Sequence, residues 1–165
     1  MWLSTENGLL TEIEQKWFAE YIRDFEPNRA FGARNFYNQS IIENKYLENS
    51  DFIQKLKTKI EEAGQQEVFF LEGFVNHVCP ETNKNDPAHK DLSPFATITF
   101  LNDDFEGGEL EVVHKNIKKI EPELYKTVII EGAKIDHRVM PVTKGNRYTF
   151  VTFWQAQQKI KNTFM

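Results

Sequence analysis

The hydrophobic positions near the start of the chain recur at helical spacing, with acidic residues between them. Apolar residues three or four positions apart fall on one face of a helix. These positions are Leu9, Leu10, Ile13, Trp17, Phe18, Tyr21 and Ile22. The pattern predicts a first helix from about Thr11 to Phe25.

A second apolar stripe, with clearer end signals, follows a polar and Asn-rich stretch. Ser50 can cap the helix, Asp51 suits its positive end, and Gly64 can end it. The stripe consists of Phe52, Ile53, Leu56 and Ile60. The stretch between the helices, Pro27 to Lys45, has alternating apolar positions and predicts one or two irregular strands.

From Glu67 onward the chain changes to short runs rich in β-branched and aromatic residues, separated by turn residues. The predicted strands are Val68 to Val78, Phe95 to Leu101, Glu109 to Val113, Lys126 to Glu131, Lys134 to Val139 and Arg147 to Trp154. Short strands at such intervals indicate a sandwich or barrel, and the preceding helices can cover one outer face of a sheet. In the last of these strands, alternation places Arg147 and Thr149 on the interior face. The expected fold class is mainly β with N-terminal helices.

Length and composition narrow the picture. With 165 residues the chain fits one domain, 1–165, in which a helical support of about 1–66 precedes a β core of about 67–155. The net charge of -5, without a run of Lys and Arg, argues against a nucleic-acid partner. No apolar run approaches the roughly 20 residues that span a membrane. A single cysteine, Cys79, and a helix-like start, Met1 to Gln15, without a signal pattern predict a cytoplasmic protein.

Three residues, two just before a predicted strand and one on a later strand, have the chemistry of a metal site. His89 and Asp91 are two positions apart, so both project to the same side of an extended segment while Lys90 points away. His137 lies on a later strand. Two imidazoles and one carboxylate can occupy one face of an octahedral metal and leave three positions open, as in non-haem Fe(II) oxygenases. Arg147, ten residues after His137, suggests an anionic co-substrate beside the metal.

Taken alone, this spacing leaves a structural interpretation open, because His-x-Asp often occurs by chance. His89 can be a solvated loop histidine after Pro87 and Ala88, and His137 can be a buried histidine of the barrel. The flanking sequence decides between the two interpretations.

Four motifs surround these residues. They are Phe95 to Asn102 (FATITFLN), Glu106 to Leu110 (EGGEL), His137 to Val142 (HRVMPV) and Gly145 to Tyr148 (GNRY). Together, over about Val68 to Trp154, the sequence resembles the prolyl 4-hydroxylase-like branch of the Fe(II)/2-oxoglutarate dioxygenases. The fold of that family is a double-stranded β-helix, or jelly roll, with N-terminal helices on one sheet.

The resemblance implies roles for individual residues. His89, Asp91 and His137 correspond to the iron ligands, and Arg147 corresponds to the residue that holds the far carboxylate of 2-oxoglutarate. Two further residues line the same pocket in this comparison. Thr99 corresponds to a hydroxyl position that bonds the same carboxylate, and Leu110 to a wall of the pocket. The implied cofactors are Fe(II), 2-oxoglutarate as co-substrate, and dioxygen, with ascorbate as an optional reductant.

One stretch departs from the family pattern. Many members have a tyrosine several residues before the His-x-Asp motif that contacts the keto acid, whereas this chain has Asn76 and His77 there. Either residue is a candidate to replace the tyrosine, and His77 is also a candidate for a structural histidine at the end of a strand.

Three functions are compatible with these features. The leading one is a dioxygenase that hydroxylates a carbon of a prolyl or other side chain in a peptide or protein, or of a small molecule, with succinate and CO2 as co-products. The second is a nucleic-acid demethylase of the same superfamily, which expects a second arginine where this chain has Phe153. The third is a non-catalytic metal-binding jelly-roll module. Substrate choice is expected in the loops Pro27 to Lys45, Glu81 to Pro87 and His114 to Leu124.

Overall fold

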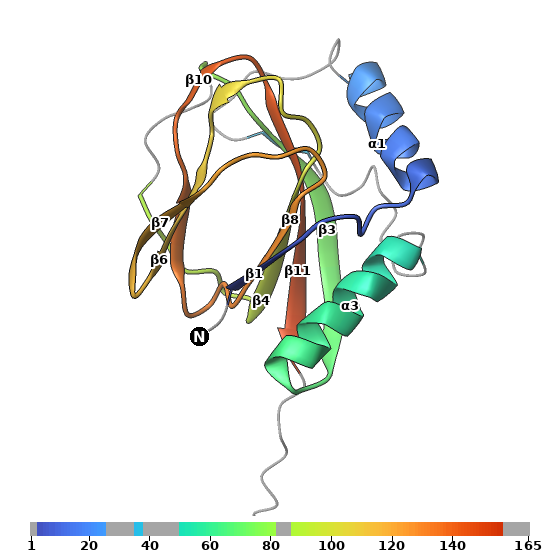
Figure 1. Cartoon of the computed structure of the whole chain (residues 1–165), viewed down its shortest axis with the longest axis vertical. Coiled ribbons are helices and arrows are strands. Elements are labelled where there is room, and N and C mark those ends of the chain that lie inside the picture. Colours follow the sequence, from blue (N-terminus) through green and yellow to red (C-terminus); the bar gives the residue numbers. More distant parts are fainter. Residues whose placement is uncertain (1–2, 26–34, 38–49, 82–86, 157–165) are drawn as a thin grey trace, which may run out of the picture.

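Two β-sheets face each other in the computed structural model, which describes residues 3–25, 35–37, 50–81 and 87–156. Two helices lie on the outer side of the larger sheet, and the smaller sheet forms the opposite wall (Figure 1). This arrangement agrees with the predicted jelly roll with N-terminal helices.

The larger sheet has six antiparallel strands, in the order β1-β8-β4-β11-β3-β2. Their bounds are β1 (Leu3–Glu6), β8 (Thr127–Ile130), β4 (Phe95–Phe100), β11 (Arg147–Ala156), β3 (Val68–Val78) and β2 (Asn35–Tyr37). The two long strands β3 and β11 pair along nearly their whole length, from Arg147 opposite Val78 to Ala156 opposite Val68. Theirs is the longest strand pairing of the sheet.

The smaller sheet has the order β7-β6-β9 and carries part of the predicted metal site. Its strands are β6 (Leu110–His114), β7 (Asn116–Ile120) and β9 (Asp136–Val139). A separate pair joins β5 (Glu106–Gly107) to β10 (Val142–Lys144). An isolated antiparallel bridge between His89 and His137 adds the segment before β4 to the free side of β9.

The helices α1 (Glu12–Phe25) and α3 (Asp51–Gly64) confirm both helix predictions within one residue at each end. The Ser50 hydroxyl accepts a hydrogen bond from the Ile53 amide, which is the capping contact that the sequence predicts. Phe52 and Phe18 pack on Phe150 of β11, with ring centroids 6.0 and 4.9 Å apart. The helices therefore bury the outer face of the larger sheet.

Strand alternation assigns the two faces of the larger sheet. Tyr148, Phe150 and Trp154 belong to the core beneath the helices, whereas Val151 belongs to a second core between the two sheets. This second core, which we call the interior cluster, contains Phe74, Ala96, Ile98, Phe100, Leu110, Val112, Ile120, Val128, Ile130, Ile135 and Val151. The period of two in β11 thus places Arg147 and Thr149 on the interior face, as the sequence predicts.

Two parts of the N-terminal region differ from the prediction or fall outside it. Leu3–Glu6 is not helical but forms β1, the edge strand next to β8, where backbone pairing overrides the acidic, helix-like composition. Of the predicted irregular stretch Pro27 to Lys45, only Asn35–Tyr37 is described, and these residues form β2; the rest lies outside the described residues. No helix within the described ranges is long and apolar enough to span a membrane.

Candidate metal and co-substrate site

The backbone brings His89 and His137 together although 48 positions separate them. The His89 amide donates to the His137 carbonyl at 3.0 Å, and the His137 amide donates to the His89 carbonyl at 2.9 Å. Two residues further on, the Asp91 amide donates to the Gly132 carbonyl at 2.8 Å. These main-chain hydrogen bonds hold His89 and Asp91 against the segment 132–137, which contains His137.

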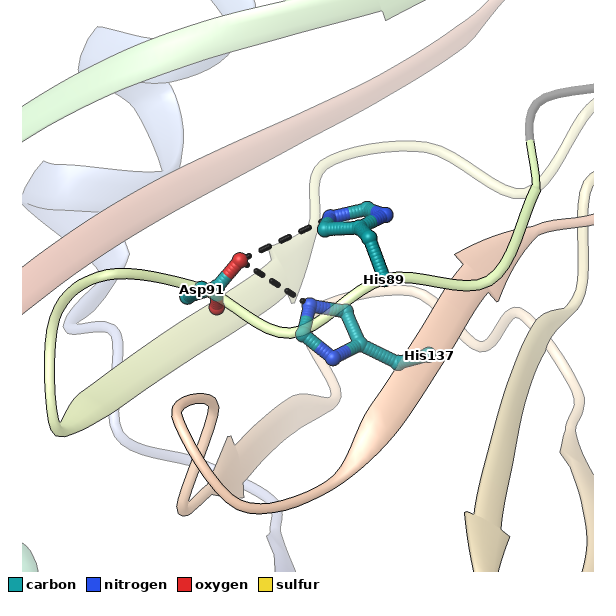
Figure 2. A group of neighbouring side chains, drawn as sticks. All are labelled: His89, Asp91 and His137. Atoms are coloured by element: carbon teal, nitrogen blue, oxygen red, sulfur yellow. Dashed lines mark ion pairs between the residues drawn. The ribbon is translucent and has the colours of Figure 1, made fainter.

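The three side chains converge on one point (Figure 2). Asp91 Oδ1 lies 3.5 Å from His89 Nε2 and 3.2 Å from His137 Nε2. The donor atoms of the three residues all lie within 4.8 Å of one another, so the group can hold a metal ion. His89 is half-exposed, whereas Asp91 and His137 are largely buried. Lys90 points away and makes an exposed ion pair with Asp136 at 2.9 Å.

A hydrogen bond fixes the tautomer of His137. Its Nδ1 lies 2.8 Å from the Ile135 carbonyl oxygen, which can only accept, so Nδ1 carries the hydrogen. The Nε2 lone pair of the neutral ring consequently faces the Asp91 carboxylate. Two acceptors at this distance need a proton or a cation between them, and a metal ion meets that need.

The same contact determines the pKa of His137. Burial of the ring lowers this pKa, but the hydrogen bond to Asp91 and the charge of Asp91 raise it, with smaller contributions from the Ile135 carbonyl and from Asp136. The net effect raises the pKa of His137 above its ordinary value of 6.5.

Arg147 is a buried cation on the interior face of β11, with 1% of its surface exposed. Its Nε donates to the Gly108 carbonyl at 2.8 Å, and its Nη1 to the Thr149 hydroxyl at 3.5 Å. The guanidinium carbon lies 5.2 Å from the centre of the Phe100 ring. Burial lowers the pKa of Arg147 to about 10, against the opposing charge of Glu109, so the side chain stays charged at neutral pH.

One nitrogen of this guanidinium, Nη2, has no hydrogen-bond partner within the described part of the chain. Leaving a buried charged donor unpaired costs free energy, and native proteins seldom do so without a reason. A carboxylate accepts from guanidinium nitrogens in a fork, so this cation suits an anionic co-substrate. Arg147 shares a face of the larger sheet with Phe100, and His137 lies opposite Val112 in the smaller sheet. Phe100 and Val112 both belong to the interior cluster, so Arg147 and His137 face the same space.

The structure corrects the position expected for Thr99. This residue lies opposite Phe150, on the face of the sheet that packs against the helices, and its hydroxyl is hydrogen-bonded to the Thr127 hydroxyl at 2.8 Å. Odd positions of β4 face the helices and even positions face the interior, so Thr99 and Arg147 are on opposite faces. Thr99 therefore does not face the proposed co-substrate pocket. Leu110 is buried in the interior cluster, and its role as a wall stays a prediction.

The sequence interpretation missed both hydrogen-bond partners of Arg147, which are Thr149 and Gly108. Alternation placed Thr149 on the interior face, yet nothing in the sequence indicates that Arg147 folds back along its own strand to reach it. The Gly108 contact depends on close approach: a Cβ at this glycine would lie 2.8 Å from the Arg147 Cδ, and its φ is +72°. The pair Gly107-Gly108 is the feature of the sequence that could have indicated this close approach.

The structure also separates Asn76 from His77. His77 is buried on the helix side, where its ring stacks on Tyr148 at 4.8 Å and its Nε2 lies 2.9 Å from Asn146 Oδ1. Asn76 pairs with Thr149 across β3 and β11, so it shares the interior face with Arg147. Asn76 is therefore the candidate that faces the proposed pocket. Residues 82–86 of the predicted loop Glu81 to Pro87 lie outside the described residues.

Fold and site together define a jelly roll with two histidines and one carboxylate gathered at one wall and a buried arginine facing the same interior. The family comparison agrees with this class. The sequence profile of the 2OG-Fe(II) oxygenase superfamily matches residues 73–155, just over half of the chain. The chain belongs to this superfamily and is a 2-oxoglutarate-dependent dioxygenase, with Fe(II) as its metal and 2-oxoglutarate as its co-substrate.

Solved structures show the same fold. A prolyl-4-hydroxylase from Pseudomonas putida is 13% identical, with 94% of this chain and 93% of that chain covered and a TM-score of 0.63. A collagen prolyl hydroxylase of Paramecium Bursaria Chlorella virus-1 is 16% identical (96% and 91% covered, TM-score 0.64). A prolyl hydroxylase from Trichoplax adhaerens, solved with a peptide fragment of hypoxia inducible factor, is 13% identical (93% and 83% covered, TM-score 0.69). No curated protein matches the sequence.

We predict that Asp91→Asn lowers the pKa of His137 in the metal-free protein, because the substitution removes the charge that raises it. An NMR titration of the ring measures this pKa. Since the folded value lies above 6.5, protonation of His137 stabilises the metal-free fold below that pH, and the contribution is lost as the pH rises through the folded pKa.

Asp136→Asn is the matched control for this titration. Asp136 contributes only the smallest of the effects that raise the pKa of His137, so its loss should change that pKa less than the loss of Asp91. An equal or larger change in the Asp136 variant would contradict the assignment.

Proposed function

We propose that this chain binds Fe(II) through His89, Asp91 and His137, anchors 2-oxoglutarate at Arg147, and hydroxylates a carbon of a peptide or protein substrate, with succinate and CO2 as co-products. A prolyl side chain is the first candidate target. The observation that carries the proposal is the buried guanidinium of Arg147, whose Nη2 has no partner among the described residues.

The donor set supports Fe(II) at the triad. Imidazole nitrogens and one carboxylate oxygen are ligands that Fe(II) accepts on one face, while the opposite positions stay open for other groups. The Nε2 atom of His137 faces the site because Nδ1 is held by the Ile135 carbonyl. The half-exposed His89 places the triad within reach of solvent and substrate.

The protein side of the mechanism is binding and orientation. Arg147 holds the far carboxylate of 2-oxoglutarate with Nη2, while the Gly108 carbonyl and Thr149 hydroxyl fix the plane of the guanidinium. Asn76, on the neighbouring strand β3, contributes an amide to the same pocket. When bound, the iron would activate dioxygen while 2-oxoglutarate supplies two electrons and is converted to succinate and CO2, so that one oxygen atom enters succinate and the other enters a C–H bond of the substrate.

A peptide substrate is supported by the prolyl hydroxylases among the structural neighbours, one of which was solved with a peptide fragment. The packing of α1 and α3 on the larger sheet supports treating 1–165 as a single domain.

A nucleic-acid demethylase is disfavoured by Phe153. That branch has a second arginine at this position, whereas Phe153 packs against Phe74 with ring centroids 5.8 Å apart. A non-catalytic metal-binding module has no use for a buried anion anchor such as Arg147, whose Nη2 has no partner among the described residues.

We predict that Arg147→Gln weakens the binding of 2-oxoglutarate by roughly one to two decades, since a charge-assisted hydrogen bond contributes about 1.5–3 kcal/mol. The affinity of the same protein for the metal should change little, because Arg147 is not one of the metal donors. Calorimetric titration with 2-oxoglutarate in the presence of a redox-inert divalent metal measures the first quantity.

Arg138→Gln serves as the matched control, because Arg138 is also an arginine beside the site but pairs with Glu111 at 2.9 Å instead of facing the pocket. It should bind 2-oxoglutarate like the wild type. Equal affinities for wild type and Arg147→Gln would remove Arg147 from the site.

The substrate class is tested by incubating the protein with Fe(II), ascorbate, 2-oxoglutarate and a library of proline-containing peptides, followed by mass spectrometry. We expect one peptide class to gain the mass of one oxygen, with succinate formed in equal amount, and no gain with Asp91→Ala. A gain confined to small molecules of a cell extract would contradict the peptide assignment.

A further inference from the structure

Gly132 lies against the carboxylate of Asp91. The residue is buried in the turn between β8 and β9, and its carbonyl accepts the hydrogen bond from the Asp91 amide at 2.8 Å. A Cβ built on Gly132 would lie 2.3 Å from Asp91 Oδ2, 3.1 Å from its Cγ and 3.3 Å from its Cβ. No side chain other than that of glycine fits there without moving the carboxylate.

The two oxygens of Asp91 have different surroundings. Oδ1 faces both histidines, at 3.5 and 3.2 Å, whereas Oδ2 occupies the space next to the Gly132 Cα. The absence of a side chain at Gly132 thus determines where the second oxygen lies, and with it the direction in which Oδ1 points.

Backbone conformation does not explain the glycine. Gly107, Gly108 and Gly145 have positive φ angles, which favour glycine whatever their neighbours, but the φ of Gly132 is outside that region. An alanine can adopt the backbone conformation of Gly132. The close approach of Asp91 is therefore the feature that requires glycine at this position.

We propose that Gly132 is a positioning residue for the metal-binding carboxylate: it leaves the space that lets Asp91 present Oδ1 to the metal. This inference rests on the proposed metal site. In Gly132→Ala the added methyl group displaces the carboxylate by rotation about its side-chain bonds, and the metal loses a correctly oriented ligand while the turn keeps its conformation.

The test is a titration of metal-free protein with Co(II), as a probe for a divalent ion in the Fe(II) site, together with thermal unfolding of the metal-free proteins. Gly132→Ala should bind Co(II) at least about tenfold more weakly than the wild type, in the range seen when groups that orient metal ligands are removed. Gly64→Ala is the control: it adds the same methyl group at the end of α3, where the nearest atom, Phe95 Cζ, is 3.3 Å away. Its affinity for Co(II) should equal that of the wild type.

If Gly132→Ala also lowers the unfolding temperature, the same substitution is made in an Asp91→Gly background, which removes every side-chain atom that the methyl group would meet at position 91. The proposal predicts that the loss of stability disappears there, because the group that the methyl meets is gone; a loss that persists overturns it. Wild-type affinity for Co(II) in Gly132→Ala overturns it as well. The single variant Asp91→Ala distinguishes a failure of this proposal from a failure of the metal site. Wild-type Co(II) binding in that variant would refute the metal site itself and not only the role of Gly132.

Discussion

The pair of main-chain hydrogen bonds between His89 and His137 is the contact on which the site depends. These bonds attach the segment carrying His89 and Asp91 to β9, so residues distant in sequence become neighbours on one wall of the barrel. A third hydrogen bond, from the Asp91 amide to the Gly132 carbonyl, attaches the same segment to the turn between β8 and β9. Because backbone groups make these contacts, the three candidate metal-binding residues are brought together without the metal.

Two features of this geometry are unfavourable without ligands. The lone pair of His137 Nε2 faces the Asp91 carboxylate, and the buried guanidinium of Arg147 has a donor without a partner among the described residues. A proton or a metal cation relieves the first and an anion relieves the second, and Fe(II) and 2-oxoglutarate carry the charges of such ligands. The superfamily membership of the chain and the charge requirements of its site therefore agree.

Much of this arrangement follows from local sequence patterns. Helical stripes and the Ser50 cap predict both helices, and alternation in β11 places Arg147 on the interior face, because each of these signals acts within one element. The resemblance placed Thr99 in the pocket, but the face that a residue occupies depends on the register of its strand with β11, which neither the resemblance nor a single-strand pattern fixes. The role proposed for Gly132 depends on the approach of a side chain 41 positions away, and the strand β1 depends on pairing with β8. Such long-range contacts leave little trace in composition.

The central claim is that iron and 2-oxoglutarate meet in one site formed by the triad and Arg147. The most direct measurement is the visible absorption of the protein with Fe(II) and 2-oxoglutarate under anaerobic conditions. The account predicts a weak charge-transfer band that needs both components, is absent in His137→Ala, and decays when air is admitted. A protein that binds saturating Fe(II) and 2-oxoglutarate without developing this band would contradict the account.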